Sequence, residues 1–205
     1  GIWNSGLSIG SAGQVVKVNS GASALEFGTV SSDYVKLGSV TASASGVVTF
    51  DNLFTSDYKV YKIFIKRAHG STDNSSIRVR YRGGGSQLTG SVYKNFHQGG
   101  YFSSSSNTSV LNRSWNGDHH NLTLNGLDNN VQHGLTGEYT LFDPQASDVR
   151  KNHICHMVHN VYDQTLFWNY TSAGAYDDTT VLTGIEFYMN TGNISGIFTL
   201  YGIKE

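Results

Sequence analysis

Apolar and polar side chains alternate with a period of two residues over much of the chain. Ile77, Val79 and Tyr81 alternate with the arginines at 78, 80 and 82. Such alternation places one set of side chains on each face of a β-strand, so this segment predicts a half-buried strand. The segments 59–67 and 185–189 have the same pattern. Apolar residues do not recur at helical spacing over three turns anywhere, which argues against amphipathic helices.

The spacing of these segments favours one fold class. Further strands are predicted near 35–42, 46–50, 89–96, 121–127, 135–142, 149–160, 164–170 and 197–203. Glycine and Asn/Asp clusters, including Gly83–Gly85 and Gly99–Gly100, predict turns between them. The last segment is apolar on both faces, so we expect it inside a sheet. About ten short strands predict an all-β fold, an antiparallel β-sandwich of jelly-roll type.

The alternation also predicts which side chains form the core. The segments with the clearest pattern place their apolar set on a single face. We expect the following residues to be mostly buried: Ile77, Val79, Tyr81, Ile185, Phe187, Ile197 and Tyr201.

Residues 1–33 differ from the rest of the chain. They are rich in Gly, Ser and Ala, and we expect no strand longer than about four residues there. Such a segment buries too little apolar surface to fold alone, so it predicts a neck or shaft linker before a head domain at 34–205. We expect the neck to be ordered only in an oligomer, with Val15, Val18, Leu25 and Phe27 facing other chains.

Composition excludes several function classes. Charged residues make up 14%, and 14 Lys and Arg oppose 15 Asp and Glu, which argues against nucleic-acid binding. The 38% of hydrophobic residues suffices for a core. No apolar run approaches the ~20 residues of a membrane span, so we expect no membrane insertion. Cys155 is the only cysteine, so an intrachain disulfide is impossible. Because the chain begins at Gly1 without a signal-like segment, we expect a fragment of a longer protein.

Charge is unevenly distributed along the chain. Basic residues dominate 59–94, whereas acidic residues dominate 95–205. The favoured interpretation is that neighbouring strands pair opposite charges across a sheet. The alternative is a basic patch for phosphate-bearing surface glycans.

Residues 153–159 contain several residue types that commonly bind metals. On a strand, His153, Cys155 and His159 share one face with Met157, and His156 points away. The outer two histidines then lie roughly 20 Å apart, too far for one metal within a chain. We therefore expect structural histidines and no metal. A metal on a threefold axis, bound by one histidine from each of three chains, is the remaining alternative.

The stretch from Ser103 to Asn121 is the longest polar segment without strand alternation, so we expect a loop. It ends in a polar, aromatic group that offers one stacking face, donors and acceptors for a sugar. These candidate receptor-binding residues are Trp115, Asn116, Asp118, His119 and His120. The alternatives are that Trp115 folds into the core or anchors a subunit interface. The pair Asp177–Asp178 predicts an acidic turn rather than a Ca²⁺ site.

Catalytic motifs are missing from the sequence. No G-x-S-x-G, H-E-x-x-H or Ser-His-Asp context is present, and Gly83–Gly85 lacks the Lys-Ser/Thr of a phosphate loop. We therefore expect no catalytic residue, no enzyme activity and no cofactor.

Two stretches resemble virion proteins of tailed bacteriophages. Residues 10–28 (GSAGQVVKVNSGASALEFG) resemble a segment that recurs in tail-fibre-like proteins, notably of marine phages. Residues 194–204 (ISGIFTLYGIK) resemble the strand that closes jelly-roll tip domains in such fibres. The resemblance implies a homotrimeric fibre on the virion, with a neck followed by a receptor-binding head. It implies no catalytic residue.

These observations lead to one functional expectation. The chain is expected to be a tail-fibre head that binds a host-surface glycan or protein receptor and contacts other virion tail proteins. One alternative is a structural or decoration protein of the virion without a receptor role. Another, from a different class, is a surface-glycan hydrolase.

Overall fold

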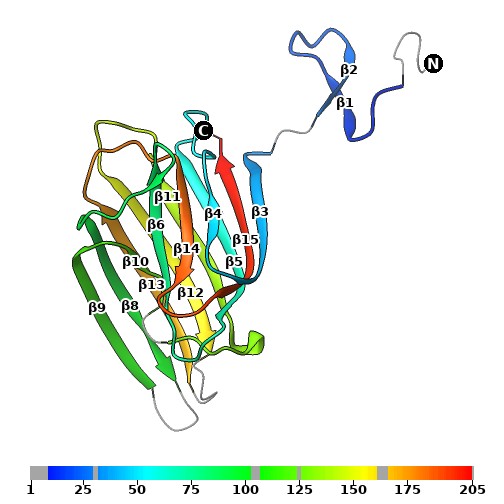
Figure 1. Ribbon diagram of the computed structural model, residues 1–205. Coiled ribbons are helices and arrows are strands. Elements are labelled where there is room, and N and C mark those ends of the chain that lie inside the picture. Colours follow the sequence, from blue (N-terminus) through cyan, green and yellow to red (C-terminus); the bar gives the residue numbers. More distant parts are fainter. Residues whose placement is uncertain (1–8, 30–31, 103–106, 124–125, 161–165, 205) are drawn as a thin grey trace. The chain divides into compact units, whose positions relative to one another are not determined.

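The chain divides into two compact units, residues Gly1–Asp33 and Tyr34–Glu205. The computed structural model describes residues 9–29, 32–102, 107–123, 126–160 and 166–204, and for 113–116 it describes the backbone alone. The predicted neck therefore lies partly outside the described residues, at 1–8 and 30–31. The second unit contains the sandwich (Figure 1).

The first unit contains a β-hairpin. Strand β1 (Gln14–Val18) pairs antiparallel with β2 (Leu25–Thr29), so each strand is slightly longer than we expected from sequence. The register pairs Val16 with Phe27 and Val18 with Leu25, which places these four side chains on one face. The other face carries Val15 beside an ion pair of Lys17 with Glu26 at 3.3 Å. The predicted neck residues are thus divided between the two faces of the hairpin.

The larger sheet of the second unit has eight antiparallel strands. From one edge to the other it consists of β3 (Tyr34–Ser45), β15 (Ile194–Ile203), β5 (Val60–Gly70), β11 (Leu135–Phe142), β12 (Lys151–Asn160), β13 (Phe167–Tyr176), β8 (Tyr93–Phe102) and β9 (Asn107–Gly117). The last strand in sequence, β15, lies between β3 and β5, as its two apolar faces predicted.

A smaller sheet packs on one face of the larger sheet. Its strands are β10 (His120–Asn121), β6 (Ile77–Gly83), β14 (Gly184–Met189) and β4 (Val48–Phe50), and β7 (Ser86–Gln87) pairs with β6. A single 3₁₀ turn, η1 (Val131–His133), is present within the described residues. The predicted all-β antiparallel sandwich is therefore confirmed. We call the packed face of the larger sheet its inner face and the opposite one its outer face.

The core lies between the two sheets. Tyr61, Ile63 and Ile65 of β5 are buried there. The ring centroid of Phe187 in β14 lies 5.2 Å from that of Phe198 in β15. The hydroxyls of Tyr81 and Tyr139 lie 2.6 Å apart and link the two sheets. Phe198 and Leu200 are fully buried. Ile197 and Tyr201 are only partly buried, which corrects their predicted place in the core because the outer face carries them. The other predicted core residues are buried.

Strand β5 contains a one-residue bulge. Its buried residues are Tyr61, Ile63 and Ile65 before the bulge and Ala68 and Gly70 after it, so the buried phase changes by one position. Arg67 has a φ of +53° at this point. The registers with β11 and β15 both shift here. The extra residue thus keeps the inner face apolar along the whole strand.

Several predicted boundaries are wrong. Gly99 and Gly100 lie within β8 instead of forming a turn, and β8 ends at Phe102 rather than near residue 96. The expected strand at 121–127 is reduced to β10, with residues 124–125 outside the described part. The glycine turn at Gly84 and Gly85 is present, and both residues have positive φ, as a tight hairpin requires. None of the described residues lies in a helix with the length and hydropathy needed to cross a bilayer.

The core assignment predicts the cost of one substitution. Phe187→Ala should lower the free energy of unfolding by about 3–5 kcal/mol, because it removes a fully buried ring between the sheets. Phe64→Ala, on the outer face and 41% exposed, is the matched control and should cost less than about 1 kcal/mol. Chemical denaturation of both variants measures the difference. Equal losses would show that the faces of the larger sheet are wrongly assigned.

Candidate functional site

The outer face of the larger sheet carries a groove of about 370 Å³ over β11, β12, β13 and β8. Its floor includes Thr140, whose side chain points outward yet is only 7% exposed. Phe96 and Ile154, which are 48% and 53% exposed, form an apolar wall. The lining also contains the polar side chains of Gln98, Glu138, His156 and Thr171, together with Cys155, Ser172 and Ala173. We call this site the outer-face groove.

Strand pairing positions these side chains. The register places Thr140 beside Ile154, Ile154 beside Ala173 and Ala173 beside Phe96, in one row across four strands. A second row contains Glu138, His156, Thr171 and Gln98. Because side chains of one row project from the same face, an apolar row and a polar row lie side by side.

The polar row is partly fixed by hydrogen bonds. Lys62 Nζ donates to Glu138 Oε2 at 3.1 Å, so the one carboxylate lining the described part of the groove is neutralised. His156 Nε2 lies 2.7 Å from Asn169 Oδ1, which orients the imidazole. The groove therefore offers hydrogen-bond donors and acceptors beside an exposed aromatic ring, with little net charge. This chemistry suits an uncharged polyol such as a sugar.

The predicted receptor-binding loop is mostly a strand. Residues 107–117 form β9 at the sheet edge, and 103–106 lie outside the described residues. Polar residues therefore form a regular strand here, because pairing with β8 satisfies their backbone. The side chains of Trp115 and Asn116 are also outside the described part, so their receptor role stays a prediction.

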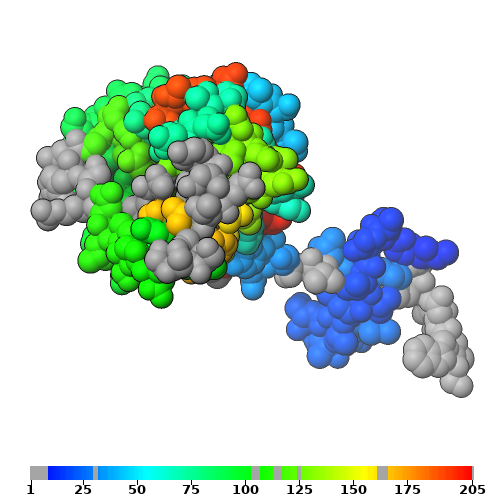
Figure 2. Space-filling view, turned by 90° about the horizontal axis from the view of Figure 1, so that it is seen from below, coloured from blue at the N-terminus to red at the C-terminus, as the bar shows by residue number. Residues whose placement is uncertain are grey.

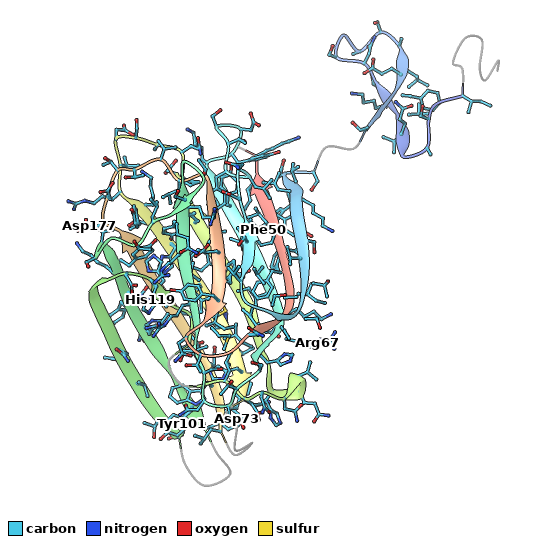
Figure 3. The ribbon with its side chains drawn as sticks, viewed as in Figure 1. Phe50, Arg67, Asp73, Tyr101, His119 and Asp177 are labelled. Carbon is cyan, nitrogen blue, oxygen red and sulfur yellow. The ribbon has the colours of Figure 1, made fainter. Side chains whose placement is uncertain are left out.

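Asp118 and His119 belong to a charged cluster beside β6. Arg80 Nη2 donates to Asp118 Oδ2 at 2.6 Å, and His119 Nδ1 lies 2.5 Å from Asp118 Oδ1. Burial would raise the pKa of Asp118, but the hydrogen bonds from His119 and Arg80 outweigh it and lower the pKa. Figure 3 labels His119 in this region. These two residues therefore anchor the turn after β9 to the smaller sheet.

His120 is fully buried, which corrects its expected role in contacting a receptor. Its Nδ1 lies 2.6 Å from Asn95 Oδ1, and its ring centroid is 4.2 Å from that of His153. The side chain packs between the sheets because the register of β10 with β6 turns it toward the inside of the sandwich. A ligand on the surface has no access to it.

The strand β12 confirms the predicted faces of the 153–159 motif. His153, Cys155, Met157 and His159 are buried, and His156 points to the outer face. Among the described residues no three His, Cys, Asp or Glu side chains form a metal-binding group. Burial raises the pKa of the Cys155 thiol to about 11, and its Sγ lies 2.6 Å from Ser172 Oγ. The thiol is therefore protonated at neutral pH and unsuited to act as a nucleophile.

Most of the unevenly distributed charges form ion pairs and hydrogen bonds within the fold. Arg82 pairs with Asp51 and Glu186, each at 3.1 Å, which supports pairing of opposite charges across strands. Lys94 and Arg150 both pair with Asp177 in the turn after β13, and the hydrogen bond from Lys94 lowers the Asp177 pKa. Asp178 accepts hydrogen bonds from Thr180 at the same turn. Both carboxylates of this segment are therefore held by neighbouring side chains, and Figure 3 labels Asp177.

Sequence reasoning missed the outer-face groove. Phe96, Glu138 and Ile154 lie in predicted strands, but on the face opposite the buried one, where an apolar Phe96 or Ile154 gives no separate signal. Gln98 and Thr171 lie beyond the predicted ends of their strands. Figure 2 shows one end of the sandwich unit, where segments of different colour, and so far apart in the sequence, lie side by side. The proximity of the groove residues depends on the pairing of β8 with β13, two strands that lie far apart in the sequence.

Comparison with known proteins identifies no relative. The chain matches no protein-family model, no curated protein and no solved structure. The chemistry of the groove therefore rests on its own geometry, and the resemblance of 10–28 and 194–204 to fibre segments stays an expectation.

The buried histidines predict a pH dependence of stability. Burial lowers the pKa of His97 and His159 to about 4, and burial with a smaller effect of His97 lowers that of His153 to about 3. Above pH 6.5 these groups are neutral in both states. As the pH falls below 6.5, the unfolded chain binds protons that the folded chain excludes, so stability decreases until the folded pKa is reached. Each histidine should cost about 2 kcal/mol between pH 6.5 and 5.

The variant His153→Phe tests this dependence. It removes one titrating group from the interior and should flatten the fall in unfolding free energy between pH 6.5 and 5. Leu141→Ala is the control, because it destabilises the core without removing a titratable group. Denaturation midpoints measured at several pH values compare the two. An unchanged slope in His153→Phe would mean that this imidazole is protonated inside the fold.

Proposed function

We propose that this chain is the head of a homotrimeric bacteriophage tail fibre, which binds a glycan on the host cell surface during adsorption. The observation that carries the proposal is the outer-face groove, an exposed aromatic and polar site on a regular sandwich. The resemblance of 10–28 and 194–204 to fibre segments supports the virion location. Contacts with other virion tail proteins belong to the same proposal.

Binding is favoured over hydrolysis by the carboxylates of the groove. Glycosidases generally use two carboxyl groups on either side of the scissile bond. Glu138 is the one carboxylate that lines the described part of the groove, and it pairs with Lys62. Such a site supports recognition of a sugar without cleavage.

The hairpin supports the homotrimer. Val16, Val18 and Leu25 are 50%, 58% and 55% exposed, although they lie on one face with Phe27. A two-stranded hairpin with an uncovered apolar face is marginally stable by itself. Packing of this face against the same face of other chains buries it and stabilises a neck.

One matched pair of variants tests the neck. Val18→Asp places a charge on the apolar face and should lower the oligomer mass, because a buried unpaired carboxylate is costly. Val15→Asp, on the face with the Lys17–Glu26 pair, should weaken assembly less. Analytical ultracentrifugation measures the mass, and circular dichroism checks that the sandwich stays folded. A monomeric parent protein would overturn the trimer.

Glycan binding is tested on an array of bacterial capsular and O-antigen polysaccharides and on whole bacterial cells. The full chain should bind at least one polysaccharide, and Phe96→Ala should weaken the signal because it removes the exposed ring of the groove. Phe64→Ala, the same change on the same face outside the groove, should bind as the parent does.

Other outcomes identify the alternatives. Release of reducing sugar would indicate a hydrolase. Cell binding that survives periodate but is lost after protease treatment would indicate a protein receptor. Binding to no cell and no polysaccharide would favour a structural or decoration protein of the virion.

A further inference from the structure

A second hollow lies on the same outer face, farther along β8 and β13. It has a volume of about 600 Å³, and residues of β8, β9 and β13 line it, among them Phe102, Ser109 and Phe167. The rings of Phe102 and Phe167 pair with centroids 5.2 Å apart, and Phe102 is 57% exposed. An exposed aromatic surface is therefore present at this end as well.

The two hollows are neighbours along the same pair of strands. Gln98 and Thr171 of the outer-face groove are paired in the register, and the next outward pair is Gly100 with Asn169 of the second hollow. The contact of His156 with Asn169, at 2.7 Å, links them. Gly100 has no side chain, so nothing from β8 rises between Gln98 and Phe102.

The resulting track is long and has aromatic ends. Phe96 and Phe102 lie six residues apart on β8, which corresponds to about 20 Å in a strand. Figure 3 marks the two ends of this strand, with Asp177 near its start and Tyr101 near its end. Between the aromatic ends lie the hydrogen-bonding side chains of Gln98, Thr171 and Asn169 and the exposed Leu111 of β9, which pairs with Gln98. The Glu138 carboxylate pairs with Lys62.

We infer that this track binds a linear, uncharged oligosaccharide several sugars long, aligned with β8 and β13. The inference rests on the proposed function and names its ligand class. A sugar ring stacks on Phe96 at one end and another on the Phe102–Phe167 pair at the other, because the apolar face of a pyranose covers an aromatic ring. The polar row between them, with Gln98, Thr171 and Asn169, exchanges hydrogen bonds with the sugar hydroxyls.

The charge of the track separates this ligand from anionic polymers. A site for an anionic polysaccharide needs unpaired cations along its length. Among the described side chains that line the two hollows, none is a lysine or arginine, and Lys62 beside the groove pairs with Glu138. Binding should therefore depend little on salt, whereas association with a polyanion weakens steeply as salt rises.

The test uses the full chain and oligosaccharides of one, two, four and six sugars, cut from the array polysaccharide that binds best. Affinity, measured by isothermal titration calorimetry, should rise up to about four sugars and then level off. Phe96→Ala should weaken all lengths, whereas Phe102→Ala should weaken the long oligosaccharides by about tenfold and leave the short ones unchanged. Phe64→Ala is the control and should match the parent at every length.

Several results would overturn the track. One is equal affinity for one and six sugars, and another is a Phe102→Ala variant that binds long oligosaccharides as the parent does. In both cases glycan binding itself would stand. Binding restricted to anionic glycans at low salt, or loss of the oligomer in Phe96→Ala, would also overturn it, the latter by showing that a second copy of the chain covers this face. Failure to bind any polysaccharide would instead reject the proposed function.

Discussion

The sandwich depends on the single bulge in β5. This strand lies between β15 and β11, so its inward side chains pack beside those of the strands on either side. A strictly alternating strand of this length would turn Ala68 and Gly70 outward, because a shift of one residue exchanges the two faces. Arg67 supplies the extra residue in a left-handed conformation, and its backbone N–H donates to Thr136 Oγ1 at 3.2 Å. The bulge therefore keeps the inward side chains of β5 in the core from one end of the strand to the other.

The parts of the fold that sequence predicts are those with an unambiguous alternation. The strands around Ile77–Tyr81 and Ile185–Phe187 have apolar residues on one face and charged or polar ones on the other, and the structure follows them. The last strand is apolar on both faces, so its phase was undetermined, and Ile197 was assigned to the wrong side. The pattern also fails in β8 and β12, where the buried face holds Asn95, His97 and His153. Aromatic and polar contacts across the sheets stabilise these buried polar side chains. No local sequence pattern predicts such contacts.

The candidate site was unpredictable for a related reason. Sequence reasoning looks for binding residues in polar segments without alternation, and it selected 103–121. Pairing with β8 converts most of that segment into strand, and Asp118 is occupied by Arg80. The groove instead combines Phe96, Glu138 and Ile154, which come from three separate strands. Their proximity follows from strand order, a long-range property that hydrophobic periodicity does not contain.

On β8 and β12, alternate residues pack in the core and line the outer-face groove. On β12 the odd-numbered positions are buried, while Ile154 and His156 point outward into the groove. Substitutions at outward positions change the surface without opening a cavity in the core, since their neighbours in sequence hold the packing. A lineage under pressure to follow a changing partner can therefore vary every second residue of these strands and keep the same scaffold.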